Sequence, residues 1–499
     1  MNNLNNKILI STKWASITEV VAKLITPITN MILARILVPE AFGVVATITM
    51  ITSFADMFTD AGFQKYLVQH EFESEEEKWL STNVAFWTNL GISFLLWILI
   101  IISSDKLAIM VGNDGLGHVI SIACMQLPIT SFSSIQMSIY RRNFDFKTLF
   151  SVRIISICVP FIVTIPLALL GYSYWALIIG TLCGTLSNAV VLTIKSPWKP
   201  NFIYSIKMLK EMLSFSIWSL VESISIWLTN WIDTFIIGSM LSSYYLGVYK
   251  TSLTAVNSIF TLVTASTTPI LFSALSRVQN DNKKFNDIFF TMQKTISYFV
   301  IPMSVGIFIY SDLVVKILLG DGWIEANSVV GIWGILTGIV IVLGHYSSEV
   351  YRSKGMPKLS FIAQLLHIIV LIPTCIIASY HGFSTLVNTR ALVRLQGVLV
   401  HLIIMKFIIG IPIINIFKNI FIPTISAILM GIIGFIIKGI SNSFIWQITS
   451  IFICIVLYFI ILMLFKTSRS DILNFVKRTN ILEKLKVSRD IKSKLSNNM

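Results

Sequence analysis

The residues that could do chemistry are the charged side chains that interrupt long apolar stretches of the chain. A charge at the centre of a membrane-spanning helix costs roughly 2.5–3.5 kcal/mol on insertion scales, so such side chains tend to face a partner or a water-filled cavity. In the first stretch, Glu19, Lys23, Thr26 and Asn30 follow one another at helical spacing, which places all four on one face of a helix. A stripe of this composition can bind an ion or a charged ligand.

The buried cations and the buried carboxylates predict two kinds of site. Arg390 and Arg394 lie in the stretch 383–408 without an acidic residue beside them, and at about 1.5 Å per residue Arg394 is about 16 Å deep. Lys23 is comparably deep from the other side, so these three are our candidates for contact with an anionic ligand. A buried carboxylate can take up a proton, and the candidates for ion coupling are Glu19, Asp56, Glu222, Asp233 and Glu349.

Several of these charges also have a purely structural interpretation. Glu19 and Lys23 are four residues apart and can form an ion pair within one helix. Arg153 and Arg352 lie near predicted helix ends, where long side chains extend to the lipid headgroups. The sequence does not choose among the carboxylates.

The sequence has neither a phosphate-binding loop of the form G-x-x-x-x-G-K followed by Ser or Thr, nor an H-E-x-x-H zinc motif. The cysteines are scattered inside apolar stretches, none of them in a C-x-x-C motif, and we interpret them as buried thiols: Cys124, Cys158, Cys183, Cys375 and Cys454. We therefore expect no metal, no cofactor and no catalytic residues.

The elements that must position these charges are membrane-spanning helices. Hydrophobic residues make up 55% of the chain and charged residues only 12%, against about 25% in soluble domains. Apolar stretches of about 20 residues, enough for a helix to span a bilayer, recur from end to end. The sequence predicts an all-α membrane protein with about fourteen spans, near 8–33, 42–66, 79–103, 116–140, 148–170, 172–194, 212–238, 246–273, 286–310, 327–350, 358–380, 383–408, 417–438 and 444–466.

An internal repeat divides the chain. The stretch 37–44 (LVPEAFGV) recurs 204 residues later at 241–248 (LSSYYLGV), and Trp14 falls opposite Trp218 at the same offset. A period this long indicates a duplicated domain. Each copy has six spans, so both enter the membrane in the same direction, as parallel repeats do. The expected division is an N-terminal lobe 1–195, a linker 196–211, a C-terminal lobe 212–408, two added helices 409–466 and a basic tail 467–499.

Lysine and arginine gather in one set of the predicted loops. The other set holds only Arg35, Lys106, Lys250, Lys316 and Lys438. The positive-inside rule places the richer set, and with it both chain termini, in the cytoplasm. This asymmetry explains the net charge of +14 without a nucleic-acid partner. We interpret the tail as a basic helix on the inner leaflet; the alternative is a solvated, disordered tail.

Five stretches carry a resemblance to a known family: 33–43 (LARILVPEAFG), 60–69 (DAGFQKYLVQ), 141–147 (RRNFDFK), 233–238 (DTFIIG) and 246–249 (LGVY). With them the chain resembles the polysaccharide-export (Wzx-type) oligosaccharide-lipid flippases of the multidrug/oligosaccharidyl-lipid/polysaccharide superfamily. The resemblance extends over essentially the whole chain and is strongest before residue 280.

The resemblance implies two six-helix lobes, two added helices and alternating access in a bacterial inner membrane. The implied substrates are undecaprenyl-diphosphate-linked oligosaccharide repeat units, moved from the cytoplasmic to the periplasmic face for O-antigen, capsule or exopolysaccharide. It also implies ion coupling, anion contact at Lys23, Arg390 and Arg394, and a polysaccharide polymerase with its chain-length machinery as partners.

Three other functions remain open at this point. A multidrug cation antiporter of the same superfamily would need an acidic and aromatic cavity. A peptidoglycan-precursor flippase would be essential for growth. A membrane polysaccharide polymerase or ligase would need catalytic residues on a large periplasmic loop, whereas the longest predicted loops here are short and mostly cytoplasmic.

Overall fold

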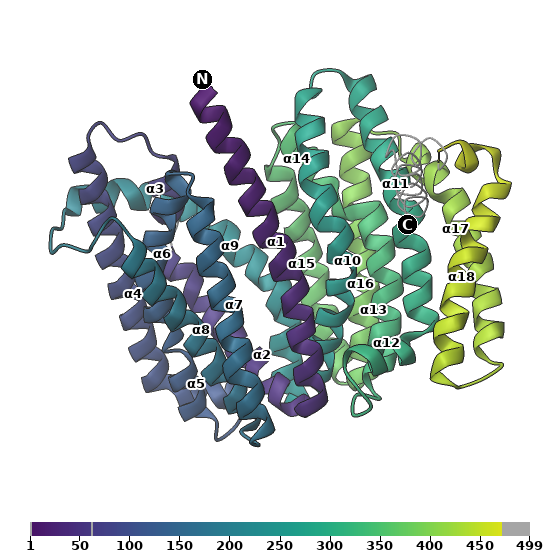
Figure 1. Ribbon diagram of the computed structural model, residues 1–499, viewed down its shortest axis with the longest axis horizontal. Coiled ribbons are helices and arrows are strands. Elements are labelled where there is room, and N and C mark those ends of the chain that lie inside the picture. Colours follow the sequence, from purple (N-terminus) through teal and green to yellow (C-terminus); the bar gives the residue numbers. More distant parts are fainter. Residues whose placement is uncertain (1, 61–62, 472–499) are drawn as a thin grey trace, which may run out of the picture.

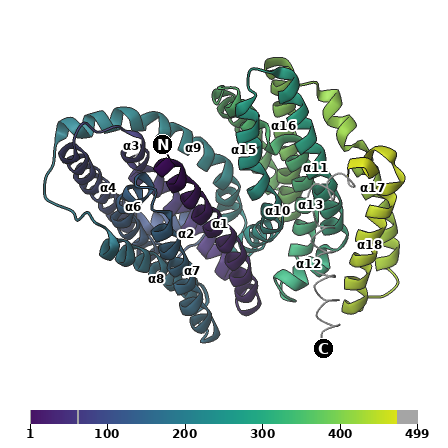
Figure 2. The same ribbon diagram turned by 45° about the horizontal axis from the view of Figure 1, so that its top comes forward.

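The structure is a computed structural model that describes residues 2–60 and 63–471, except for the side chains of residues 2–13, 15–16, 19–20, 24, 59–60, 65 and 214–222. Most of the predicted basic tail, residues 472–499, lies outside this description. Every regular element in the described part is a helix. The helices form two lobes side by side, with two further helices at the outer edge of the second lobe (Figures 1 and 2).

The described residues of the N-lobe form α1 (Asn2–Ile36), α2 (Pro39–Asp60), α3 (Phe63–Gln69), α4 (Glu75–Met110), α5 (Gly117–Ala123), α6 (Gln126–Arg142), α7 (Phe146–Leu169) and α8 (Ser173–Lys195). The C-lobe consists of α9 (Ile206–Met240), α10 (Ser243–Arg277), α11 (Asn282–Ile309), α12 (Ser311–Leu318), α13 (Ala326–Val340), the π-helix η1 (Ile341–His345), α14 (Ser347–Ser353), α15 (Lys358–Ser379), α16 (Phe383–Ile404) and the π-helix η2 (Met405–Ile409). The added pair is α17 (Ile413–Lys438) and α18 (Phe444–Leu464).

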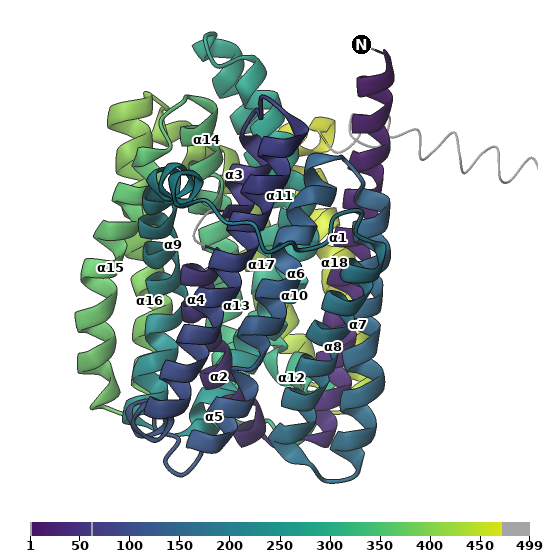
Figure 3. The same ribbon diagram turned by 90° about the vertical axis from the view of Figure 1, so that its left-hand side faces the viewer.

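Twelve helical segments of the described chain are long and apolar enough to cross a bilayer. Together with α1 and α9, each 35 residues long, they are consistent with the fourteen predicted spans. Figure 3 shows the long helices running roughly parallel, with the N terminus at the end opposite the α1–α2 turn. The prediction of an all-helical membrane protein is therefore confirmed.

Polar capping residues set where several of these helices begin. Asp145, Ser205, Ser242 and Asp281 precede α7, α9, α10 and α11, and each side chain accepts a hydrogen bond from the backbone N–H three residues later. Such a cap satisfies one of the N–H groups that the first turn of a helix leaves without a partner. The helix starts are thus encoded locally.

The internal repeat is visible in how the helices pack. In the N-lobe α1 packs on α7, α7 on α8 and α6 on α8; in the C-lobe α9 packs on α15, α15 on α16 and α13 on α16. These pairs occupy equivalent places in the two copies. Two parallel six-helix repeats forming two lobes, as predicted, are thus present.

The repeated stretch itself forms the contact between the lobes. Gly43 of α2 and Gly247 of α10 stand at equivalent positions, 204 residues apart, as do Pro39 and Ser243. A Cβ atom on Gly43 would collide with the carbonyl oxygen of Ser243, and a Cβ atom on Gly247 would collide with that of Pro39. The two motifs therefore cross backbone against backbone in a two-fold arrangement that only glycine permits. We call this end of the molecule, with the α1–α2 turn, the closed end.

Hydrogen bonds between the lobes reinforce the closed end. The indole N–H of Trp323 donates to the carbonyl oxygen of Ala34 at 2.7 Å, and a guanidinium N–H of Arg35 donates to the carbonyl oxygen of Ile317 at 2.8 Å. The first of these bonds is fully buried, so it is shielded from competition by water. The closed end is thus held by polar contacts as well as by close backbone packing.

Asn113 joins the lobes through a buried side chain. Its amide donates to the hydroxyl of Thr47 at 2.9 Å, and its carbonyl oxygen accepts from the hydroxyl of Ser243, in the other lobe, at 2.5 Å. We expect Asn113→Ala to lower the free energy of unfolding by about 1–3 kcal/mol, because two hydroxyls lose their buried partner. Thermal unfolding of the detergent-solubilised protein measures this, with the exposed Asn257→Ala as the control that should change little. Equal effects from both variants would contradict this role.

Candidate functional site

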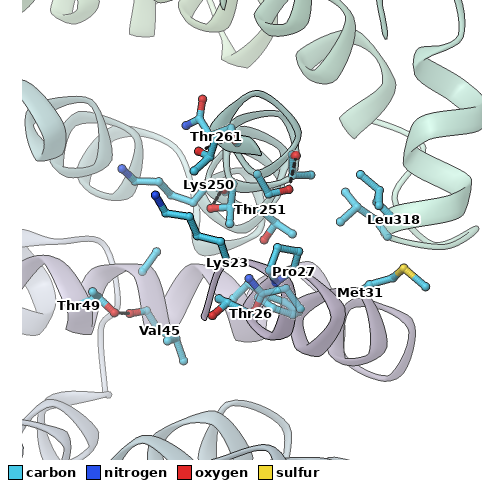
Figure 4. Close-up of a pocket in the computed structure, with 18 of the residues that line it drawn as sticks. Lys23, Thr26, Pro27, Met31, Val45, Thr49, Lys250, Thr251, Thr261 and Leu318 are labelled. Atoms are coloured by element: carbon cyan, nitrogen blue, oxygen red, sulfur yellow. Dashed lines mark hydrogen bonds between the residues drawn. The ribbon is translucent and has the colours of Figure 1, made fainter. Parts of the chain in front are cut away.

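A cavity of about 670 Å³ lies between the two lobes. Its walls come mainly from α1 and α2 of the N-lobe and from α10 of the C-lobe, with single residues from α7 and α9. The polar and charged residues that line this interlobe cavity are Lys23, Thr26, Asn30, Thr49, Arg153, Lys250, Thr251, Thr254, Asn257, Ser258 and Thr261. Figure 4 shows Lys23, Thr26 and Thr49 of the N-lobe and Lys250, Thr251 and Thr261 of the C-lobe around this cavity.

Positive charge and hydroxyl groups dominate the interlobe cavity. Lys23, Arg153 and Lys250 line it, and no Asp or Glu is among its described lining residues. Lys23 and Lys250 come from opposite lobes and extend in the same direction (Figure 4). Ammonium and guanidinium groups form the strongest hydrogen bonds with anionic oxygens, and hydroxyl and amide side chains suit a neutral polar ligand. The lining residues can therefore form hydrogen bonds with anionic oxygens and with hydroxyl groups.

Helical periodicity explains why α10 presents this surface. Lys250, Thr254, Asn257 and Thr261 recur at i, i+4, i+7 and i+11 and line the cavity. Another face of α10 carries the fully buried Tyr249, Val256 and Phe260, which pack in the C-lobe core. An amphipathic helix with this pattern must turn its polar stripe to the cavity.

On α1, the predicted polar stripe reaches the cavity. Lys23, Thr26 and Asn30 all line it, as the spacing of the stripe predicts. The side chain of Glu19, at the start of the stripe, lies outside the described residues. The described part of the stripe thus contributes one cation and two neutral polar groups.

Lys250 is the residue that sequence reasoning missed. We expected it in a loop on the side poor in lysine and arginine, whereas the structure places it two turns inside α10, in the cavity wall. The expectation failed because Lys250 lies only seven residues after the start of α10, about 10 Å along the helix. The polar stripe that it begins on α10 was the signal that could have identified it.

Asp233, predicted as a coupling carboxylate, lies at the centre of a buried cluster behind Lys250. Its Oδ2 accepts hydrogen bonds from Nε of Arg390 at 3.1 Å and from the hydroxyl of Tyr249 at 2.7 Å. Its Oδ1 lies 3.7 Å from Nζ of Lys250. Only 3% of the Asp233 side chain is exposed, so it meets the cavity through Lys250 and not directly.

Arg390 and Arg394, predicted as anion contacts, do not line the interlobe cavity. Arg390 is buried against Asp233, and Arg394 donates to the hydroxyl of Thr337 at 2.8 Å. Both guanidinium groups stack over the ring of Trp333, at 5.6 and 4.4 Å from its centroid, where the face of the ring attracts a cation. Direct anion contact by these two residues stays a prediction, and their place inside the C-lobe favours a structural role.

Glu349 and Asp56, two further predicted carboxylates, are not among the described residues that line the cavity. Glu349 is buried and pairs with Arg352 at 3.4 Å, and Asp56 is half-buried on α2. The side chain of Glu222 lies outside the described residues. Among residues 2–60 and 63–471, no group of three His, Cys, Asp or Glu side chains is placed to hold a metal ion. Ion coupling through any of these carboxylates stays a prediction.

Comparison with known proteins adds to this geometry. The model of a family described as "polysaccharide biosynthesis protein" matches residues 32–328. An uncharacterized membrane protein in the cps region of Klebsiella pneumoniae is 22% identical over 433 residues, which cover 86% of this chain and 88% of that protein. The teichuronic acid biosynthesis protein TuaB of Bacillus subtilis (strain 168) is 23% identical over 450 residues, which cover 89% of this chain and 91% of that protein.

Among solved structures, the lipid II flippase MurJ in an inward closed conformation resembles this chain with a TM-score of 0.74. The likeness covers 90% of this chain and 98% of that structure, at 18% sequence identity. At this identity the comparison shows a shared fold, and the two-lobed arrangement of helices is therefore common to both proteins.

Proposed function

The chain belongs to the polysaccharide biosynthesis protein family, and on this premise we propose that it is a flippase for lipid-linked oligosaccharides. Its substrates are undecaprenyl-diphosphate-linked repeat units, which it moves from the cytoplasmic to the periplasmic face of a bacterial inner membrane by alternating access. The protein is a transporter and not an enzyme. The units are precursors of a surface glycan of the O-antigen, capsule or exopolysaccharide type.

The observation that carries this proposal is the cationic, hydroxyl-rich cavity between the lobes. Lys23 and Lys250 supply positive charge from opposite lobes for the diphosphate, and Arg153 adds a third cation. The threonine, serine and asparagine side chains of α10 offer hydrogen bonds to sugar hydroxyls. The lipid tail remains in the bilayer, because transfer of its long apolar chain into a polar cavity is unfavourable.

The closed end supports alternating access. The backbone crossing at Gly43 and Gly247 and the bonds of Asn113, Arg35 and Trp323 block passage at that end. The positive-inside rule assigns the closed end to the periplasm and both chain termini to the cytoplasm. In this orientation we infer that the cavity takes up substrate from the cytoplasm, and that release requires the lobes to separate at the closed end.

The membrane potential favours this direction of transport. Moving one elementary charge across 100 mV is worth about 2.3 kcal/mol, and the cell interior is negative, so an exported anion moves downhill. Inward movement of a proton or sodium ion adds to this driving force. On the periplasmic face, a polysaccharide polymerase and its chain-length machinery receive the repeat units.

Export of a cationic drug is the main rival function within the same fold. A drug antiporter needs carboxylates to bind its cations, whereas the described residues that line this cavity include three cations and no carboxylate. The charge of the cavity therefore favours the flippase.

Deletion of the gene in its bacterial host tests the proposed function. We expect surface glycan to be lost and lipid-linked repeat units to accumulate on the cytoplasmic face, with both effects reversed by the full-length gene on a plasmid. A glycan blot and extraction of the lipid fraction measure the two effects. Normal surface glycan together with increased sensitivity to cationic dyes would overturn the flippase proposal in favour of a drug antiporter.

A further inference from the structure

Lys250 stands between two environments. Its side chain is 20% exposed and lines the interlobe cavity, yet its Nζ also lies 3.7 Å from Oδ1 of Asp233 and 3.2 Å from the carbonyl oxygen of Asn230. A hydrogen-bonded pair of ammonium and carboxylate usually spans about 2.7–2.9 Å, so the contact with Asp233 is a loose one. Lysine has a flexible four-carbon stem, and Lys250 can therefore turn from Asp233 towards a ligand in the cavity.

Asp233 has closer partners than Lys250. Arg390 donates to it at 3.1 Å and Tyr249 at 2.7 Å, and the backbone N–H of Thr234 donates to its Oδ1 at 2.7 Å. A buried carboxylate without a compensating cation is strongly destabilising. Because Arg390 remains in place, Asp233 stays compensated when Lys250 turns away. When Lys250 turns away it gives up the contact with Asp233, the hydrogen bond to the carbonyl oxygen of Asn230 and the contact with the ring of Trp231, 4.5 Å from its centroid, while Asp233 keeps a cationic partner.

We propose that Asp233 is a positioning residue. It binds Lys250 while the cavity is empty, and Lys250 moves from Asp233 to the diphosphate when the substrate binds. This inference rests on the proposed function. The carboxylate competes with the ligand for the same ammonium group, so it weakens binding of any anion. A ligand takes Lys250 from Asp233 only if its contacts with Lys23 and with the hydroxyl groups compensate for the lost contact between Lys250 and Asp233.

The same exchange connects ligand binding to the helices of the C-lobe. Asp233 lies on α9, Lys250 and Tyr249 on α10, and Arg390 on α16. When Lys250 moves to the ligand, α9 loses the two polar contacts that Asp233 and Asn230 make with Lys250, while the hydrogen bonds of Asp233 with Tyr249 and Arg390 remain. Occupancy of the cavity is thereby transmitted to the packing of α9 against α10.

The residues of this cluster are not repeated at the equivalent positions of the N-lobe. At the repeat offset of 204 residues, Thr29 takes the place of Asp233, Val45 that of Tyr249, and Ala46 that of Lys250. The hydroxyl of Thr29 donates to the carbonyl oxygen of Ile25 in its own helix. The arrangement of Asp233, Tyr249 and Lys250 is therefore not repeated at the equivalent N-lobe positions Thr29, Val45 and Ala46.

Binding of undecaprenyl diphosphate to the full-length protein in lipid nanodiscs tests this inference. Lys250→Met should weaken binding at least tenfold. Asp233→Asn should tighten it by roughly three- to tenfold, and the double variant should bind as weakly as Lys250→Met alone. A purely structural role of Asp233 would not tighten binding. The matched control is Asp312→Asn, which breaks the ion pair with Lys438 away from the cavity and should leave binding unchanged.

The outcomes separate the inference from the proposed function. If Lys250→Met weakens binding while Asp233→Asn does not tighten it, the inference is wrong and the cavity remains the binding site. The inference is also wrong if Asp233→Asn tightens binding equally in the Lys250→Met background. In that case, loss of the negative charge of Asp233 would favour the anionic ligand without any part played by Lys250. If neither Lys250→Met nor Lys23→Met alters binding, the proposed site itself is wrong. If Asp233→Asn does not fold, the variant to test is Asp233→Asn combined with Arg390→Met. This variant also removes the buried arginine that loss of Asp233 would otherwise leave unpaired, and we expect it to bind the ligand more tightly by the same factor.

Discussion

Replacing Lys23 and Lys250 together by methionine should abolish export of the surface glycan. Each lysine is expected to make a charge-assisted hydrogen bond to the diphosphate, worth about 1.5–3 kcal/mol, and each 1.4 kcal/mol corresponds to a factor of about ten in affinity. Loss of both therefore lowers affinity by two orders of magnitude or more. Methionine keeps the length of the side chain and suits the membrane interior. The measurement is complementation of the deletion strain, read as surface glycan.

Two controls accompany this experiment. Lys106→Met removes an exposed lysine near the end of α4, away from the cavity, and should complement fully. The double arginine variant at positions 23 and 250 keeps both charges and should restore a substantial part of the export. Full complementation by the double methionine variant, at normal protein levels in the membrane, would rule out anion binding in this cavity.

Replacing Gly43 and Gly247 by alanine should prevent the lobes from meeting at the closed end. Each new methyl group would collide with a backbone carbonyl of the other lobe, and backbone cannot turn aside as a flexible side chain can. We therefore expect the double variant to stay open at this end and to lose transport. Distances between spin labels at the exposed Val38 and Ile324, measured after serine replaces the half-buried Cys158 and Cys183, should increase relative to the parent protein.

The control for this variant makes the same chemical change elsewhere. Gly91 and Gly306 have open space where a Cβ atom would lie, and alanine in a helix is favoured over glycine by about 1 kcal/mol. Their double alanine variant should be at least as stable as the parent and should transport normally. If the Gly43 and Gly247 variant closes and transports like this control, the crossing is not a gate.

Much of the fold could be predicted from sequence, because its signals are local. Lengths of apolar stretches predicted the spans, and the recurrence of LVPEAFGV as LSSYYLGV predicted two parallel lobes. The repeat alone did not predict that these two stretches would pack against each other. That contact depends on Gly43 and Gly247 meeting across 204 residues of chain.

The candidate site was predictable only in part. The stripe on α1 identified Lys23 because its spacing is a property of one helix. Lys250 was assigned to the wrong environment by its position near a helix start, and Arg390 and Arg394 were separated from the cavity by partners that their own helix does not contain. A charge that looks unpaired on its own helix can be compensated from another one.

The sequence by itself determined the helical type of the elements, the duplication and the polar faces, since hydrophobic length and periodicity arise from neighbouring residues. Only the tertiary structure decided which charges pair and which face the cavity. Asp233 and Arg390 are 157 residues apart, and Lys23 and Lys250 come from different lobes. Whether a cation becomes a binding group or the partner of a buried carboxylate depends on which helices lie beside it, and that is set by the packing of the whole molecule.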